Sequence, residues 1–296
     1  MSRPIEGMSA SSRVSIFLAY GCISLRQTVQ MTWRAIAKHR AAGDTRFAQS
    51  LGMFLSRLHW QSHFIQKLES EPRFESDNAI SLYDTIRQAH DPEIMDAIES
   101  GRTGIPFIDG VVRQLTATGW VNFRARATLV SFVCNTCLQP WSGRWAHWLA
   151  RHFSDYEPGI HYSQLQMQAG TMGINTIRIY NPTKQLLDKD TEGLFVSRFL
   201  PELAHLPKHL QMEPWRVTEM ESIEYGFVLG RDYPTPIVDI ESANRNARVV
   251  LYGMKKSIDP AEKARVLEKH GSRKSPKKPL KKKVVKLVDE SILTLF

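Results

Sequence analysis

The chain has 296 residues, of which 42% are hydrophobic and 23% charged, a length sufficient for one or two domains with a large core. No apolar run approaches the roughly 18 residues that a membrane-spanning helix needs, and the first residues lack the order of a signal peptide. Three cysteines cannot form a closed set of disulfides. Composition therefore argues against a membrane protein and a disulfide-stabilised secreted domain, and predicts a cytoplasmic location without a membrane partner.

The net charge of +9 is unevenly distributed along the chain. Residues 271–296 hold eight basic and two acidic side chains, a surplus of six positive charges, so the remainder carries only about +3. The composition of this tail predicts disorder, and its charge can attract any polyanion. DNA binding by the rest of the chain would need a local basic patch, which a sequence does not reveal.

Helical periodicity is common and strand signals are scarce. Apolar side chains recur on a helical period from Phe47 to Leu68, which predicts a long amphipathic helix. A second helix is expected from Pro106 to Gly119, because proline suits a first helical turn and glycine a helix end. The largely apolar segment from Ala125 to Leu138 predicts a buried helix ended by Pro140.

The segment from Asp155 to Asn175 breaks this pattern with Pro158 and several glycines, which predicts a long loop of functional importance. Helices are expected again over residues 192–200 and 239–256. The predicted organisation is a lead-in over residues 1–10, a helical domain over 11–270 and the basic tail over 271–296.

Several short motifs stand in a fixed order along the chain. They are TGIPFID at 103–109, RQL at 113–115, TGW at 118–120, RIYNP at 178–182, LPEL at 200–203 and EPW at 213–215. Their residues and order resemble those of the photolyase and cryptochrome family, a class of blue-light flavoproteins, over roughly 11–256. The resemblance implies an all-α, multi-helix domain with FAD as its cofactor. Family members usually add an N-terminal α/β antenna domain of about 200 residues, so we expect a short member or a fragment.

The resemblance places a phosphate-binding run at Ser11, Ser12, Arg13, Val14 and Ser15. Hydroxyl groups and free N–H groups at a helix N-terminus suit a pyrophosphate. Taken alone, such a serine cluster is more often a plain helix cap.

Asp155 and Glu157 match an acidic segment that contacts the flavin ring, where a carboxylate pairs with an arginine, here Arg126. A buried carboxylate needs such a partner; without the resemblance, a solvated acidic loop would be the simpler interpretation. Phe54 matches a tryptophan that lines the FAD pocket, and Phe123 replaces an asparagine near flavin and lesion.

The residue that faces flavin N5 is ambiguous. Alignment backward from Asn181 and Pro182 gives Gly159, whereas alignment forward from Asp155 gives His161. A histidine and a glycine would tune the flavin differently.

The resemblance also implies a DNA cleft. Trp60 and Arg124 match a tryptophan and an arginine that hold the lesion, although such residues are more often core or surface. Arg57 replaces a lesion-contacting glutamate and Leu165 a second cleft tryptophan, which puts repair of cyclobutane dimers in doubt.

His59 and His63 stand four residues apart beside Trp60, as in a bacterial branch with histidine-rich clefts. These histidines can bind or protonate a lesion, bind a metal, or do neither.

Family members often reduce their flavin through three tryptophans. Trp141 matches the middle one, but the flavin-proximal position is Ser163. Trp145, Trp148 and Tyr162 offer another route, although aromatics at this spacing are more often core.

Cys134 and Cys137 form a CxxC pair in an apolar helix, and no second pair exists. Because structural metal sites need about four ligands, we expect inert buried thiols and no metal.

Three functions remain open: light-driven repair of pyrimidine photoproducts in DNA, a cryptochrome-like photosensor with a signalling partner, and a DNA-binding flavoprotein without repair. Arg57, Phe123 and Leu165 favour the second and third, and Trp60 and Arg124 favour the first. Repair is the leading hypothesis, with damaged DNA as the partner of a monomeric enzyme.

Overall fold

The computed structural model describes residues 4–87 and 89–271. Within these residues the chain forms fifteen α-helices and no strand, apart from an isolated bridge between Leu229 and Tyr233. The all-α prediction is therefore confirmed. None of the helices in this part of the chain is both long and apolar enough to cross a membrane. The predicted tail lies outside the described residues, except for Gly271.

The helices are α1 (Pro4–Ala10), α2 (Ser15–Ala19), α3 (Leu25–Ala41), α4 (Thr45–Ser70), α5 (Pro92–Glu99), α6 (Pro106–Thr118), α7 (Phe123–Ser131), α8 (Arg144–His152), α9 (Pro158–Ala169), α10 (Pro182–Lys189), α11 (Leu194–Phe199), α12 (Lys208–Met212), α13 (Glu219–Tyr225), α14 (Ile240–Lys256) and α15 (Pro260–His270).

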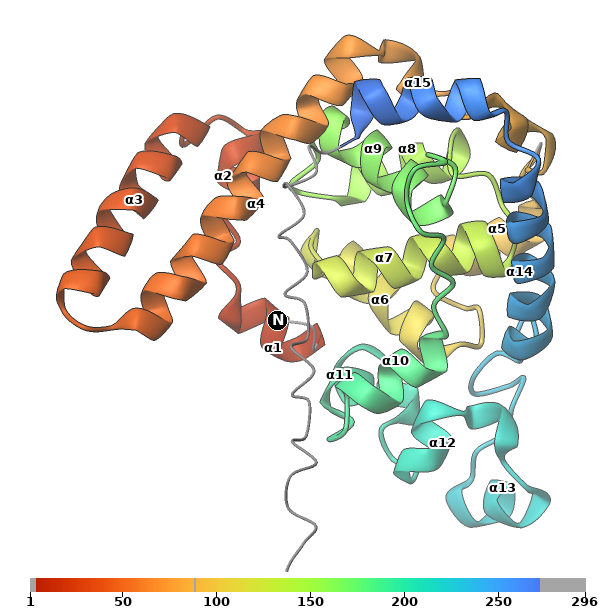
Figure 1. Ribbon diagram of the computed structural model, residues 1–296. Helices are drawn as coiled ribbons and strands as arrows, with labels where there is room; N and C mark the ends of the chain where they lie inside the picture. Colours follow the sequence, from red (N-terminus) through yellow and green to blue (C-terminus); the bar gives the residue numbers. More distant parts are fainter. Residues whose placement is uncertain (1–3, 88, 272–296) are drawn as a thin grey trace, which may run out of the picture.

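The helices α3 and α4 form a hairpin that projects from the rest of the molecule (Figure 1). A capping box between Ser24 and Gln27 starts α3, and the Asp44 side chain caps α4. The outer part of the hairpin exposes large apolar side chains, including Trp33 and Phe47. The C-terminal half of α4 instead packs against α9, so this helix links the hairpin to the body.

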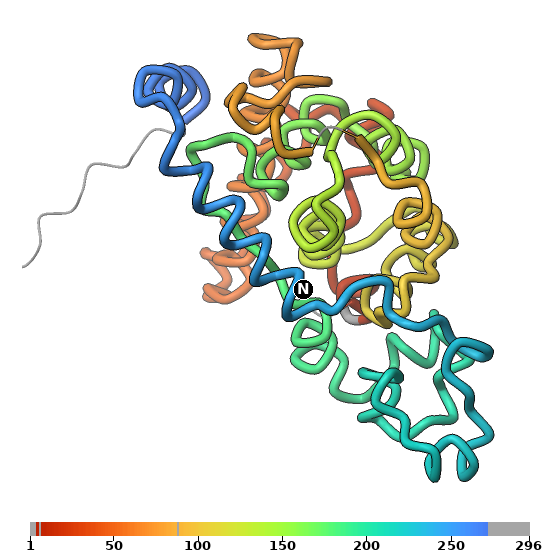
Figure 2. The backbone as a smooth tube through the Cα atoms, turned by 90° about the vertical axis from the view of Figure 1, so that its right-hand side faces the viewer, coloured from red at the N-terminus to blue at the C-terminus, as the bar shows by residue number. Residues whose placement is uncertain are grey.

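The main hydrophobic core lies among the helices from α5 to α12 and is densest around α6 and α7. A smaller cluster of Phe74, Ile80, Tyr83, Met172 and Val266 lies under α15. In Figure 2, α14 runs in blue from the region of α12 and α13 up to α15. Two segments that are distant in sequence, 72–85 and 258–270, therefore share one apolar cluster.

A buried carboxylate ties the TGIPFID motif to a distant loop. Asp109 accepts hydrogen bonds from the Thr103 backbone N–H at 2.7 Å and from the Tyr233 hydroxyl at 2.5 Å. Burial raises the pKa of Asp109, and its hydrogen bonds oppose this effect. A Cβ atom on Gly104 would lie 2.5 Å from the Thr235 backbone, so glycine is required at this close approach.

Several predicted helices are confirmed with small changes at their ends. The segment predicted over 47–68 is α4, the one over 106–119 is α6 with Gly119 as its left-handed C-cap, and the one over 239–256 is α14. The helix expected to end before Pro140 changes at Ser131 into a π-turn over Phe132–Thr136.

The predicted loop over 155–175 is wrong, because residues 158–169 form α9. Its proline and glycine mark the ends of this helix instead of a loop. Pro158 occupies the first turn, the Glu157 side chain accepts from the Gly159 backbone N–H, and Gly170 ends the helix at φ 82°. The acidic segment is thereby fixed at a helix N-terminus.

Candidate functional site

An arginine on α7 and an aspartate before α9 form the most buried ion pair among the predicted site residues. Arg126 Nη2 lies 3.0 Å from both carboxylate oxygens of Asp155, whose side chain is 6% exposed. Arg126 Nε also donates to the Val121 carbonyl, and the guanidinium lies 4.1 Å from the Phe153 ring centre. The structure thus brings together the two residues that the resemblance paired.

His161 lies one helical turn into α9 and is buried. Its Nε2 lies 3.0 Å from the Ala146 carbonyl oxygen, to which it donates. Burial lowers the pKa of His161 to about 4, so the ring is neutral at pH 7. Tyr156 and Tyr162 contact its ring edge-on, both at 5.1 Å between ring centres.

Gly159, the alternative candidate to face flavin N5, lies at the crossing of α9 and α4. A Cβ atom there would be 2.5 Å from the Cα of Ile65. Contact between two helix backbones therefore explains the glycine.

The N-terminal run of Ser11, Ser12, Arg13, Val14 and Ser15 immediately precedes and enters α2. Arg13 adopts a left-handed φ of 52°, and its guanidinium lies 5.2 Å from the ring centre of Trp120. The run therefore lies beside the connection between α6 and α7.

The N-terminal run, α7 and α4 carry side chains of the kinds that bind a flavin dinucleotide. Arg126 Nη1 has no partner among the described residues, and the Arg126 side chain is 27% exposed, so a donor is available to a ligand. Phe123, at the start of α7, is 58% exposed, and Phe54 on α4 is half-buried. Cationic donors, hydroxyl groups and aromatic rings are the chemistry that a phosphate and a flavin ring require.

The predicted cleft residues on α4 form an aromatic patch. Trp60 is half-buried and meets His63 edge-on at 5.4 Å, while the Arg57 guanidinium lies 5.8 Å from the Trp60 ring. His59 is exposed. His63 Nε2 is buried without a hydrogen-bond partner, and the pKa of His63 is lowered by burial and by neighbouring Lys67.

A second polar surface surrounds Arg124. Its Nη1 donates to the Tyr180 hydroxyl at 3.1 Å, and the guanidinium lies 5.3 Å from that ring. Next to Tyr180 is an open hollow of about 360 Å³. It is lined by Ile177, Arg178, Ile179, Tyr180, Arg248 and Tyr252.

Arg248 and Tyr252 were not predicted as site residues. They stand four residues apart on an exposed face of α14, which is the only signal that the sequence offers. Only the fold brings them beside the RIYNP motif. Leu165, predicted at the DNA cleft, is instead 3% exposed and packs in the main core.

The aromatic residues predicted for electron transfer lie at different depths. Trp141 is buried and donates from Nε1 to Asn78 at 2.7 Å. Trp145 is fully buried and stacks on Trp148 at 5.4 Å with an interplanar angle of 9°. The stack continues from Trp148 to His152, whose ring centres lie 3.9 Å apart.

Tyr162, also predicted for electron transfer, is 4% exposed, and its hydroxyl lies 3.4 Å from Glu75 Oε1. Burial raises the pKa of Tyr162.

The thiols of Cys134 and Cys137 are buried. Burial raises the pKa of Cys134 to about 12 and that of Cys137 further, so both stay protonated and unreactive at neutral pH. Among the described residues, no group of three or more potential ligands could hold a metal ion.

The fold and site define a class: an all-helical domain whose ion-paired acidic segment, N-terminal run and exposed aromatics suit a flavin dinucleotide. Comparison with known families agrees, since residues 54–252 match the model described as the FAD binding domain of DNA photolyase. The chain belongs to this family. The match supports FAD as the cofactor, in agreement with the expectation from sequence.

Individual relatives include both photolyases and cryptochromes. A deoxyribodipyrimidine photo-lyase of Alkalihalophilus pseudofirmus is 29% identical over 83% of this chain and 50% of its own length. A cryptochrome DASH of Natronomonas pharaonis is 30% identical over 80% and 48%. A bacterial class III photolyase from Agrobacterium tumefaciens superimposes with a TM-score of 0.73 at 28% identity, covering 84% of this chain and 50% of that one. The chain thus spans about half the length of these relatives.

Proposed function

We propose that this chain is a flavin-dependent enzyme that uses blue light to repair pyrimidine photoproducts in DNA. The observation that carries the proposal is the surface around Arg124. There, a hollow offers the cationic groups of Arg178 and Arg248 together with the rings of Tyr180 and Tyr252.

These groups match the chemistry of an unstacked nucleotide. Arginines neutralise phosphates, and bases stack on aromatic rings with a gain of about 1 to 3 kcal/mol per base. A base that is extruded from a duplex requires both kinds of contact. The relatives named as photolyases support a DNA substrate, since their names state a deoxyribodipyrimidine lyase.

The bound FAD would supply the electron for photochemical cleavage. The chain's own residues bind and orient it: Arg126 donates hydrogen bonds, Asp155 fixes Arg126, and the run at 11–15 binds phosphate. Neutral His161 adds no charge to this region. The stack of Trp145, Trp148 and His152 is proposed as the route that delivers electrons from the surface.

A cryptochrome-like photosensor is the second candidate. Leu165 lies in the core, so the position of a second cleft tryptophan contributes no surface to a lesion. Arg57 also gives the aromatic patch a cation in place of the glutamate of dimer-repairing relatives. Both features would leave photoreduction intact while weakening repair.

The deciding experiment illuminates the FAD-loaded chain with blue light in the presence of oligonucleotides that carry one cyclobutane dimer or one (6-4) photoproduct. Restored pyrimidines, detected by chromatography and absent in the dark, are the expected result for at least one lesion. Arg124→Ala should lower repair, whereas Arg216→Ala, at an exposed arginine that is not among the lining residues of the hollow, should not. Flavin photoreduction with both lesions unchanged would contradict repair and favour the photosensor.

A further inference from the structure

Arg87 is a buried arginine whose charge meets no carboxylate in the described part of the chain. It is 8% exposed, and burial lowers its pKa. Its Nη1 donates to the Ala169 carbonyl at 3.1 Å and its Nη2 to Asn135 Oδ1 at 2.7 Å. Ala169 ends α9, so the negative end of a helix dipole partly compensates the guanidinium. A buried cation is costly in free energy. We therefore examined what the hydrogen bonds around Arg87 hold in place.

Asn135 extends the contact from Arg87 toward the surface. It is fully buried in the π-turn over 132–136, a local distortion that redirects side chains from the ordinary helical face. Its Nδ2 lies 3.3 Å from the Arg178 carbonyl and 3.3 Å from Ser131 Oγ. The same nitrogen lies 3.2 Å from the Gln168 carbonyl. One amide group therefore links the end of α9 to the segment that lines the hollow.

Ser131, also fully buried, holds the next part of this segment. Its Oγ donates to the Arg178 carbonyl at 3.1 Å and accepts from the Tyr180 backbone N–H at 3.1 Å. Residues 177–180 belong to no helix or strand. Buried side chains of the helix and π-turn thus fix backbone that would otherwise lack regular partners.

The fixed segment ends at Tyr180, whose hydroxyl accepts from Arg124 Nη1. A continuous series of hydrogen bonds therefore joins Arg87, Asn135, Ser131, Tyr180 and Arg124. We infer that Asn135 and Ser131 are positioning residues for the DNA site: they hold Tyr180 so that its ring and hydroxyl orient Arg124. The inference rests on the proposed function, because it assigns to Arg124 the contact with DNA.

Ser131→Ala removes two hydrogen bonds to the segment with little loss of volume. We expect DNA affinity to fall about fivefold, the effect of roughly one ordinary hydrogen bond. Ser222→Ala is the matched control, because Ser222 Oγ donates one hydrogen bond of 2.7 Å to the Phe227 carbonyl beyond α13. This control should bind DNA as the native chain does.

Asn135→Asp separates positioning from folding. The carboxylate keeps an acceptor for Arg87 and gives this cation a counter-charge, but it loses both N–H donors to the segment. The melting temperature should fall, because the new carboxylate oxygen would lie against the Gln168 and Arg178 carbonyl oxygens. Affinity is therefore measured at temperatures where the variant is folded, and there it should fall by a factor similar to that of Ser131→Ala. Native affinity in the folded variant would contradict the inference.

The test measures fluorescence anisotropy of a labelled UV-irradiated oligonucleotide duplex and its unirradiated copy with the FAD-loaded chain. A double-mutant cycle distinguishes positioning of Arg124 from a purely structural role, because a structural role would give the same loss of affinity with and without Arg124. In an Arg124→Ala background, Ser131→Ala should change affinity by less than about twofold, since its effect passes through Arg124. An equal loss in both backgrounds, or no loss in either, overturns the inference while the proposed function stands. Absence of binding by the native chain overturns both.

Discussion

Arg126 holds Asp155 through a single nitrogen, Nη2, which lies 3.0 Å from each carboxylate oxygen. The pair joins α7 to the segment that precedes α9, and we propose that it forms one side of a flavin site. The Asp155 side chain is nearly inaccessible to water, and Arg126 is its ion-pair partner among the described residues.

Removal of this arginine is the first test. Arg126→Met should lower the free energy of unfolding by about 3 kcal/mol, because it leaves a buried carboxylate unpaired. FAD content after purification should fall as well. Thermal unfolding and cofactor release measure both effects. Arg144→Met is the control, since Arg144 pairs with Asp96 and Glu99 on the surface and should affect neither quantity strongly. Equal effects of the two substitutions would contradict the role of the buried pair.

The crossing of α4 and α9 allows a test with two glycines. Gly159→Ala should destabilise the fold by about 2 kcal/mol, because the new Cβ atom would lie 2.5 Å from the Ile65 Cα. Gly52 also lies within a helix, but a Cβ atom there would have no atom within 4 Å. Gly52→Ala should therefore raise the free energy of unfolding by up to about 1 kcal/mol. Chemical denaturation of both variants measures the two changes in the free energy of unfolding, which should have opposite signs. A neutral Gly159→Ala would show that the helices do not pack as described.

Lys67 is a buried lysine, 5% exposed, that forms no ion pair among the described residues; its amine lies 5.3 Å from the Phe64 ring. Burial lowers its pKa to about 8 from the usual 10.5. The folded state therefore binds this proton less tightly than the unfolded state, and the resulting penalty is complete below about pH 8 and disappears as pH rises toward 10.5.

Lys67→Met should consequently stabilise the fold at pH 7 by about 1 to 3 kcal/mol. The native chain should also gain stability between pH 8 and 10 relative to the variant, as measured by denaturation at each pH. A destabilised variant at neutral pH would indicate that Lys67 has a partner in solution.

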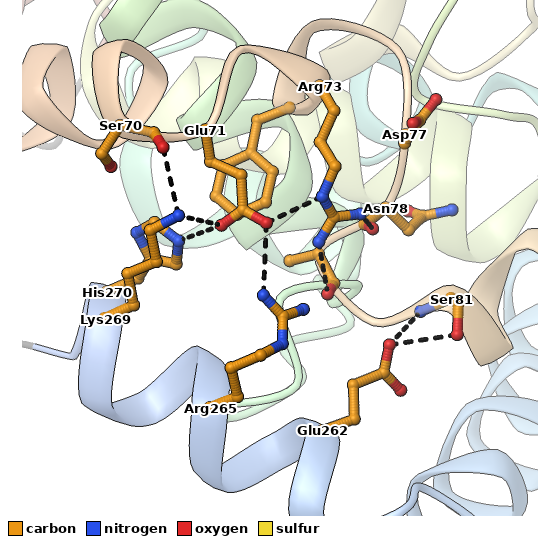
Figure 3. A network of polar contacts seen from close by, with 12 residues as sticks. Ser70, Glu71, Arg73, Asp77, Asn78, Ser81, Glu262, Arg265, Lys269 and His270 are labelled. Atoms are coloured by element: carbon orange, nitrogen blue, oxygen red, sulfur yellow. Dashed lines mark hydrogen bonds and ion pairs between the residues drawn. The ribbon is translucent and has the colours of Figure 1, made fainter.

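Glu71 anchors α15 to the end of α4 (Figure 3). Its carboxylate contacts Arg73 at 2.7 Å, Arg265 at 3.4 Å, Lys269 at 3.5 Å and His270 at 2.5 Å. Burial alone would raise the pKa of Glu71, but hydrogen bonds from His270 and Arg73 outweigh it and lower the pKa to about 2.

The stability from this carboxylate is present above about pH 4.5 and is lost as pH falls toward 2. Burial lowers the pKa of His270, so the fold also loses stability as the pH falls below 6.5. Glu71→Gln should therefore be less stable at pH 7 and show a flatter decline below pH 5. Glu268→Gln, at an exposed position of the same helix, serves as the control. Melting temperatures are measured from pH 3 to 8. The same dependence on pH in Glu71→Gln and the native chain would contradict the role of Glu71 as an anchor of α15.

The stacked tryptophans give a photochemical prediction. Trp148→Leu should slow blue-light reduction of bound FAD, because it interrupts the stack between Trp145 and His152, with little change in FAD content. Transient absorption and steady illumination measure the rate. Trp33→Leu, on the projecting hairpin, should leave the rate unchanged. An unaffected rate in Trp148→Leu would exclude this route.

Much of the fold was accessible from sequence because strong periodicity and end signals agreed. In α6 both the proline start and the glycine end were present, and in α4 the apolar period was sustained. The failure at α9 has the same physical origin, since Pro158 and Gly170 can mark either a loop or the ends of a helix.

The remaining elements depend on distant contacts that no local pattern encodes. The helix α15 buries only Val266 and His270, and it is fixed by Glu71, which lies 199 residues before His270. The pairing of Arg126 with Asp155 was predicted only through the family resemblance. The hollow joins residues 177–180 to α14, so its two unpredicted side chains could not be assigned before the fold was known.

We propose that this domain holds FAD between its N-terminal run and the Arg126–Asp155 pair, and the visible spectrum of the chain purified with FAD present tests this location. We expect a yellow protein that releases stoichiometric FAD on denaturation, and loss of that colour in Arg126→Met at temperatures where the variant remains folded. A colourless native chain that does not take up FAD on titration would contradict it.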